Sequence, residues 1–100
     1  EMTRTLYEAL GPDTSKRAFV HYPAGTYPGQ TKDIADNTHF NPYGAYQIAK
    51  CVIEGMKKAV PELAKHLKID PAYDPAHPDD VNAFRWNESP FTEIEKPDGT

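Results

Sequence analysis

The sequence predicts a small, mostly helical chain with one short strand and a proline-rich, irregular tail. Three observations support this fold class. Apolar residues recur at helical spacing through residues 42–59, and a short apolar run occupies residues 18–20. Five of the ten prolines lie after residue 70, and proline excludes long helices there.

The N-terminal segment predicts a helix followed by a strand. Gly11 and Pro12 are expected to end the helix, glycine as a left-handed cap and proline as a breaker. The run at residues 18–20 predicts the strand, and the prolines and glycines of residues 21–31 predict a structured loop. The apolar positions of the first helix are Met2, Leu6, Ala9 and Leu10.

The clearest element is a long amphipathic helix over residues 42–59. Asn41 is a good N-cap, and Pro42 suits the first helical position because its missing N–H costs nothing there. Pro61 is expected to end this helix and to open a short one through Leu67. The apolar stripe of the long helix consists of Tyr43, Tyr46, Ala49, Val52, Ile53, Met56 and Val60.

Composition indicates a chain that folds but is short of core. Leu, Ile, Val and Phe together make up 17 of the 100 residues, below the roughly 20% that ordinary domains exceed. We therefore expect a piece of something larger. No apolar run approaches the roughly 18 residues of a membrane span. The net charge of −4 leaves no basic face for nucleic acid. Cys51 cannot form an internal disulfide and is expected to be a small buried residue.

The charge divides the chain into two parts. Residues 1–69 carry a net charge of +2, whereas residues 70–100 carry −6. We expect residues 70–100 to form an acidic strap that packs on the body formed by residues 1–69. Its aromatic residues, Tyr73, Phe84, Trp86 and Phe91, are expected to pin the strap to a hydrophobic surface. The alternative for the last three is that they stack on sugar rings.

The most compact candidate for a catalytic site is the pair Asp36 and His39. A carboxylate three residues ahead of a histidine can fold back in a turn and accept the imidazole Nδ1–H. That bond fixes the tautomer, so that Nε2 faces outward as a base for a hydroxyl nucleophile. The spacing alone is also compatible with a turn aspartate and a helix-capping histidine.

Other candidates have simpler structural explanations. His21 would line a substrate groove or, as a loop histidine, bond to backbone, and His66 is expected to be solvated. An oxygen-rich cluster in the tail would suit calcium, but it lacks the glycine and the spacing of an EF-hand loop. Proline-punctuated turns explain it better, and we expect no metal. The cluster consists of Asp70, Asp74, His77, Asp79 and Asp80.

Residues 36–49, Asp-Asn-Thr-His-Phe-Asn-Pro-Tyr-Gly-Ala-Tyr-Gln-Ile-Ala, resemble the last sequence block of the SGNH (GDSL-type) hydrolases. They are most similar to the rhamnogalacturonan acetylesterase branch, as are residues 21–30 and 96–99. The resemblance implies the C-terminal part of a flavodoxin-like, three-layer α/β/α hydrolase. It implies Asp36 as the acid and His39 as the base of a Ser-His-Asp triad, with no cofactor. It further implies an acetylated pectic polysaccharide as substrate and a secreted or periplasmic location.

The chain departs from that family in one respect. The Ser, Gly and Asn blocks are absent, and its two serines, Ser15 and Ser89, lie in no Gly-Asp-Ser turn. The chain alone is therefore expected to be inactive. Without a sheet, the stripe of the long helix needs another partner, so the isolated chain is expected to self-associate or to stay partly disordered. The alternative function is a non-catalytic module that binds carbohydrate or protein through Tyr22, Tyr27, Trp86 and the acidic tail.

Overall fold

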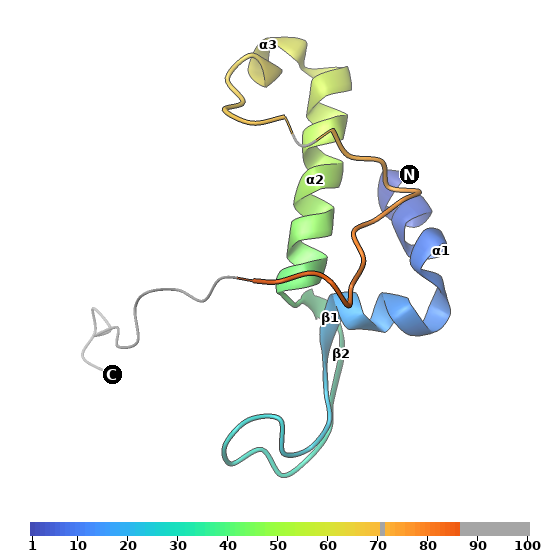
Figure 1. Cartoon of the computed structure of the whole chain (residues 1–100), viewed down its shortest axis with the longest axis vertical. Coiled ribbons are helices and arrows are strands. Elements are labelled where there is room, and N and C mark those ends of the chain that lie inside the picture. Colours follow the sequence, from blue (N-terminus) through green and yellow to red (C-terminus); the bar gives the residue numbers. More distant parts are fainter. Residues whose placement is uncertain (71, 87–100) are drawn as a thin grey trace, which may run out of the picture.

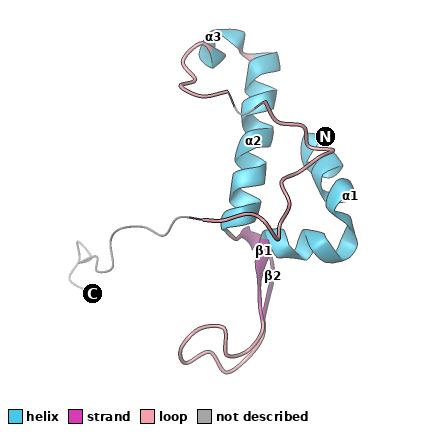
Figure 2. Ribbon diagram, viewed as in Figure 1, coloured by secondary structure: helices cyan, strands magenta, loops and turns pink. Residues whose placement is uncertain are grey.

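The computed structural model describes residues 1–70 and 72–86. Two helices, α1 and α2, dominate the described chain, and a two-stranded antiparallel ribbon extends away from them where α2 begins (Figures 1 and 2). No helix within the described ranges is long and apolar enough to span a membrane. The elements are α1 (Met2–Thr14), the 3₁₀ turn η1 (Ser15–Ala18), β1 (Phe19–Tyr22), β2 (Ile34–Phe40), α2 (Pro42–Ala59) and α3 (Pro61–Ala64).

The prediction of a mostly helical chain is confirmed, but the prediction of a single strand is wrong. Residues 34–40 form a second strand, β2, which pairs with β1. The first helix also continues beyond its expected end. Gly11 adopts a φ of 81° and a ψ of 172°, which kinks α1, and helical structure resumes at Pro12. Proline suits the first turn of a helix, so it restarts this helix instead of stopping it.

The β-ribbon contains an irregularity that places the candidate site. Phe19 pairs with Phe40, but the next residue, Val20, pairs with Asp36. One step along β1 therefore corresponds to four steps along β2, and residues 37–39 have no partner on β1. Such bulges re-aim side chains and are common next to active sites. His39 lies in this bulge, one residue before the end of β2.

Helix α2 has the predicted bounds. The Asn41 side chain accepts a hydrogen bond from the Gly44 N–H at 2.9 Å, and Pro42 occupies the first turn. Helix α3 is shorter than predicted and ends at Ala64. Beyond it the chain reaches Leu67 through turns whose amides donate to the carbonyl three residues back.

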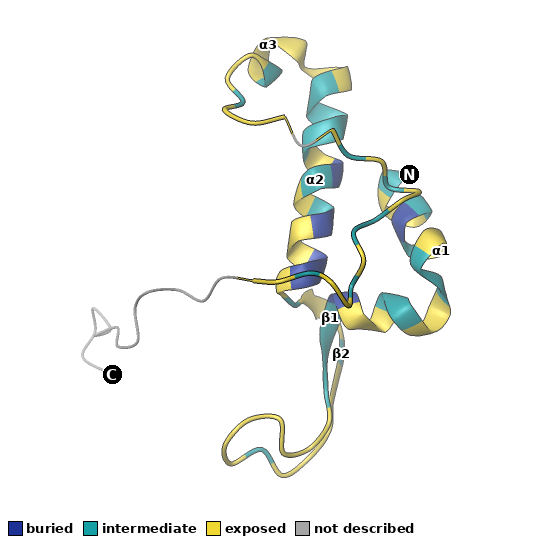
Figure 3. Ribbon diagram, viewed as in Figure 1, coloured by how far each residue is buried: buried dark blue, intermediate teal, exposed yellow. Residues whose placement is uncertain are grey.

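The core is small and lies between α1, η1 and one face of α2. Figure 3 shows the buried positions of α2 on the side that faces α1. The apolar stripe predicted from the sequence mostly lies elsewhere on the helix: Val52 is 64% exposed, and Tyr46 is also exposed. No helix or strand in the described part of the chain covers Val52. The buried residues are Leu6, Ala18, Tyr43, Gly44, Gln47 and Cys51.

Residues 72–86 run along α2 and are tied to Gln47, which is fully buried. The Gln47 Oε1 accepts from the Tyr73 hydroxyl at 2.7 Å and from the Asp79 N–H at 3.2 Å. Its Nε2 donates to the Asp79 carboxylate at 2.9 Å. These groups satisfy one another's hydrogen bonds. The buried Gln47 therefore stabilises the packing of residues 72–86 on α2.

Aromatic contacts hold the end of the same segment. Phe84 packs edge-on against Tyr43 and Tyr46, at centroid distances of 5.4 and 5.5 Å. The anchoring interpretation is thus confirmed for Phe84. Trp86 contacts Tyr46 but remains 54% exposed. The last aromatic residue of the predicted strap, Phe91, lies outside the described residues.

Candidate functional site

Asp36 and His39 are in direct contact. The His39 Nδ1 lies 2.6 Å from the Asp36 Oδ2. The other carboxylate oxygen, Oδ1, accepts backbone N–H bonds from Thr38 at 2.7 Å and from His39 at 3.0 Å. A carboxylate only accepts hydrogen bonds, so the proton of the imidazole resides on Nδ1. The Nε2 then carries the lone pair.

Backbone amides also set the charge state of this aspartate. The hydrogen bonds from the His39 and Thr38 amides, followed by the bond to the His39 ring, lower the pKa of Asp36 to about 2. The carboxylate is therefore ionised at neutral pH and favours a positive charge on the ring. The His39 side chain is 76% exposed, and no group in the described ranges hydrogen-bonds its Nε2. The arrangement is that of an oriented base open to solvent.

The residues that follow His39 fix the site to the helical body. The Asn41 Nδ2 donates to the carbonyl oxygens of Arg17 at 2.6 Å and Phe19 at 3.1 Å, while its Oδ1 caps α2. One turn on, a methyl group at Gly44 would overlap the carbonyl oxygen of Ala18 and lie 2.8 Å from its carbonyl carbon. Glycine is required at this position because α2 approaches the backbone of η1 so closely.

The tail contains a second Asp-x-x-His pair, which serves as an internal comparison. The His77 Nδ1 lies 2.9 Å from the Asp74 Oδ2, and the other oxygen accepts from the Ala76 N–H at 2.9 Å. Here the carboxylate accepts one backbone amide, and the His77 N–H bonds to the Asp74 carbonyl instead. Ring orientation by an aspartate three residues earlier is thus a local property of this spacing. Residues around His39, and not this spacing, must therefore distinguish it from His77.

His21 lies beside the candidate site, in β1. Its Nε2 is 2.6 Å from the Oδ1 of Asn37, the first residue of the bulge. The expectation that His21 lies in a loop and bonds to backbone is therefore wrong. The sequence did not single out Asn37 because its link to His21 arises from strand pairing. His66 is exposed, as predicted.

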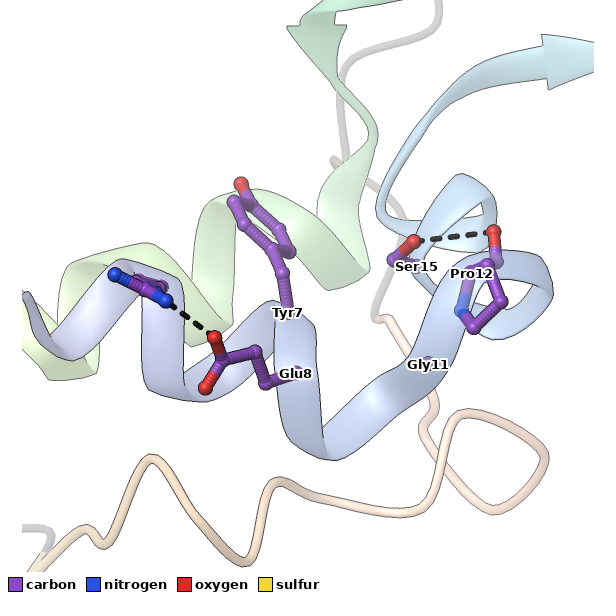
Figure 4. Close-up of a pocket in the computed structure, with 6 residues that line it drawn as sticks. Tyr7, Glu8, Gly11, Pro12 and Ser15 are labelled. Atoms are coloured by element: carbon purple, nitrogen blue, oxygen red, sulfur yellow. Dashed lines mark hydrogen bonds and ion pairs between the residues drawn. The ribbon is translucent and has the colours of Figure 1, made fainter.

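Ser15 is not placed as a nucleophile for His39. The Ser15 hydroxyl donates to the Pro12 carbonyl at 3.3 Å and lines a pocket of about 610 Å³ on α1, which Figure 4 shows with Tyr7, Glu8 and Gly11. No hydrogen bond joins Ser15 to His39 in the part of the chain that the structure describes. Ser89 lies outside it.

The acidic residues of the tail have separate partners. Asp70 pairs with Lys57 at 2.7 Å, and Asp79 pairs with Lys50 and Gln47. Asp80 accepts a turn hydrogen bond from the Asn82 N–H. Over residues 1–70 and 72–86, no group of three or more histidine, cysteine or acidic side chains is arranged to hold a metal ion.

Comparison with known proteins links the chain to one kind of enzyme. Rhamnogalacturonan acetylesterase RhgT of Bacillus subtilis (strain 168) is 45% identical to it over 65 residues. Those residues make up 65% of this chain but 28% of that protein, so the match spans less than a third of the relative's length. No family model matches the chain, and no solved structure matches it. The chain thus has a partial link to a rhamnogalacturonan acetylesterase.

Proposed function

We propose that Asp36 and His39 are the orienting acid and the general base of a serine esterase that removes acetyl groups from pectic polysaccharide. The 2.6 Å contact between Asp36 Oδ2 and His39 Nδ1 carries this proposal. The partial identity to an acetylesterase supports it. The nucleophilic serine belongs to a part of the enzyme outside these 100 residues.

The proposed reaction follows from the ionised state of Asp36 and from the lone pair on the His39 Nε2. The serine Oγ attacks the acetyl carbonyl while the His39 Nε2 takes the hydroxyl proton. Collapse of the tetrahedral intermediate breaks the ester bond, and His39 returns the proton to the departing sugar hydroxyl. Water then attacks the acetyl-enzyme with the same base, which releases acetate and restores the serine. Asp36 remains ionised throughout and stabilises the imidazolium form of His39.

In this proposal, the bulge of β2 keeps the His39 ring accessible to substrate. It removes residues 37–39 from the ladder, so the His39 ring is held by Asp36 and stays accessible. The bonds of Asn41 to Arg17 and Phe19 hold the junction in place. A general base must lie within hydrogen-bond reach of the serine proton, so small displacements of the ring reduce the rate.

The test compares two histidines in the complete polypeptide that contains this sequence. His39→Ala should reduce acetate release from acetylated rhamnogalacturonan by roughly 10³-fold or more, since triad members act as a unit. His77→Ala removes another exposed histidine that is also paired with an aspartate, and it should leave the rate unchanged. Equal rates for wild type and His39→Ala would remove the assignment and would favour the non-catalytic binding module.

A further inference from the structure

The bulge that carries His39 needs contacts other than the strand ladder to hold it in place. Residues 37–39 have no partner on β1, and the ribbon of β1 and β2 extends away from the helices (Figure 2). Beyond the far end of the bulge, Asn41 bonds to the helical body. The near end begins at Asn37, directly after Asp36. A contact at Asn37 would therefore hold the part of the bulge that Asn41 does not reach.

Asn37 is held by a histidine of the neighbouring strand. His21 pairs with Ala35, so Asn37, two residues further along β2, is its diagonal neighbour on the same face of the ribbon. The His21 Nε2 lies 2.6 Å from the Asn37 Oδ1. An amide oxygen only accepts hydrogen bonds, so the Nε2 carries the ring proton and donates it. A side-chain hydrogen bond thus joins the two strands where the ladder is interrupted.

The second Asp-x-x-His pair lacks the group that makes this contact. The two residues between Asp74 and His77 are proline and alanine, whose side chains cannot form hydrogen bonds. The first of the corresponding residues in the candidate site is Asn37, which is bonded to His21. This bond is therefore a second difference between the surroundings of the two histidines.

We propose that His21 is a positioning residue, which acts through Asn37 to hold the bulge so that the His39 ring stays on Asp36 and faces the reacting serine. The inference rests on the proposed function and deepens it. His21 donates to an amide oxygen of this chain, so it takes no part in the transfer of the acetyl group or of the serine proton. One neutral hydrogen bond corresponds to a factor of about five. The effect of His21 on the rate is therefore modest beside that of His39.

The kinetic test uses two amide substitutions of different reach. In His21→Gln the side-chain nitrogen can occupy nearly the position of the ring Nε2, whereas in His21→Asn it is shorter by one methylene group. In the complete polypeptide, His21→Gln should keep close to the wild-type kcat for acetate release. His21→Asn should lower kcat about fivefold, the loss expected of one hydrogen bond, and leave KM unchanged. His66→Ala removes an exposed histidine elsewhere and should change neither constant.

A double substitution shows whether His21 acts through Asn37. Asn37→Ala removes the same hydrogen bond from the other strand, so it should lower kcat about as much as His21→Asn. The variant that carries both changes should be no slower than either single variant, because both remove one interaction. Additive losses, a wild-type rate in Asn37→Ala, or a raised KM in His21→Asn would overturn the proposal. A raised KM would mean that His21 contacts the substrate.

Nitrogen NMR of the histidine rings tests the positioning without any reaction. In the wild type, His39 should carry its proton on Nδ1 and His21 on Nε2. His21→Asn should reduce the share of the Nδ1–H form at His39, and His21→Gln should retain it. An unchanged His39 signal in His21→Asn would overturn the positioning role even if acetate release requires His39. If acetate release ignores His39 while its ring still responds to His21, the esterase assignment fails alone, and His21 still orients His39.

Discussion

Asp36 binds His39 twice, through the ring Nδ1 at 2.6 Å and through the backbone N–H at 3.0 Å. The two contacts use different carboxylate oxygens, so the aspartate fixes both the ring and the backbone that carries it. In the tail, Asp74 binds the His77 ring but not the His77 amide. The double attachment therefore distinguishes the candidate site from the second pair.

This attachment predicts how Asp36 titrates. Its folded-state pKa of about 2 lies below the ordinary value of 3.8, so the stability it contributes is complete above about pH 4. That stability is lost as the pH falls through about 2. Carbon-detected NMR should show the Asp36 carboxyl titrating near pH 2. In His39→Ala the pKa should remain below 3.8, because the two largest causes are backbone amides. A return to the ordinary value would show that the ring dominates.

The close approach of α2 to η1 predicts opposite effects at two glycines. Gly44→Ala should destabilise the chain by about 2 kcal/mol, because the new methyl group overlaps the Ala18 backbone, which can move only with its whole turn. Gly55→Ala is the control, since its methyl group would meet only the flexible end of Met2 at 3.1 Å. It should be stabilising by about 0.5 kcal/mol through helix propensity. Urea unfolding measures both, and equal effects would contradict the packing at Gly44.

The buried amide of Gln47 predicts a graded loss of stability. Gln47→Leu leaves the Tyr73 hydroxyl and the Asp79 N–H without their acceptor and removes one of the two donors to the Asp79 carboxylate, which keeps Lys50, and should cost roughly 3 kcal/mol. Tyr73→Phe removes one of these bonds and should cost about 1 kcal/mol. Hydrogen exchange at the Asp79 amide should accelerate in Gln47→Leu. Unchanged exchange and stability would mean that residues 72–86 are held by other contacts.

The exposed face of α2 predicts self-association of the isolated chain. Tyr46, Val52 and Val60 leave large apolar areas open to solvent, and such surfaces favour association. Val52→Lys should weaken self-association roughly 100-fold, because each of the two partners loses a buried valine worth about 1.5 kcal/mol. Thr31→Lys on the exposed loop makes a similar charge change and should have no effect. Sedimentation that shows a monomer for the unmodified chain would refute this prediction.

The local signals of the sequence were sufficient for part of the fold. The bounds of α2 could be predicted because Asn41 caps it and Pro42 begins it, both through contacts within one turn. The Asp36–His39 contact was predictable for the same reason. Gly11 was interpreted correctly as a break, but Pro12 restarts the helix, and sequence alone does not distinguish these two uses of proline.

Long-range contacts account for what could not be predicted. Residues 34–40 include Asp36, Asn37 and Thr38, which do not follow the alternating apolar pattern of a strand, so β2 depends on pairing with β1. The burial of Gln47 depends on Tyr73 and Asp79, which follow it by 26 and 32 residues. The hydrogen bond from Arg17 to Asn82, 65 residues later, likewise depends on the tail.

Covalent labelling shows whether His39 activates a serine outside these 100 residues. A fluorophosphonate reacts with an activated serine: the Oγ attacks phosphorus, fluoride leaves, and the stable adduct is located by mass spectrometry. If His39 is the general base, we expect one labelled serine outside this sequence in the complete polypeptide. The label should be lost in His39→Ala and retained in His77→Ala. Labelling that persists in His39→Ala, or that falls on Ser15, would contradict the account.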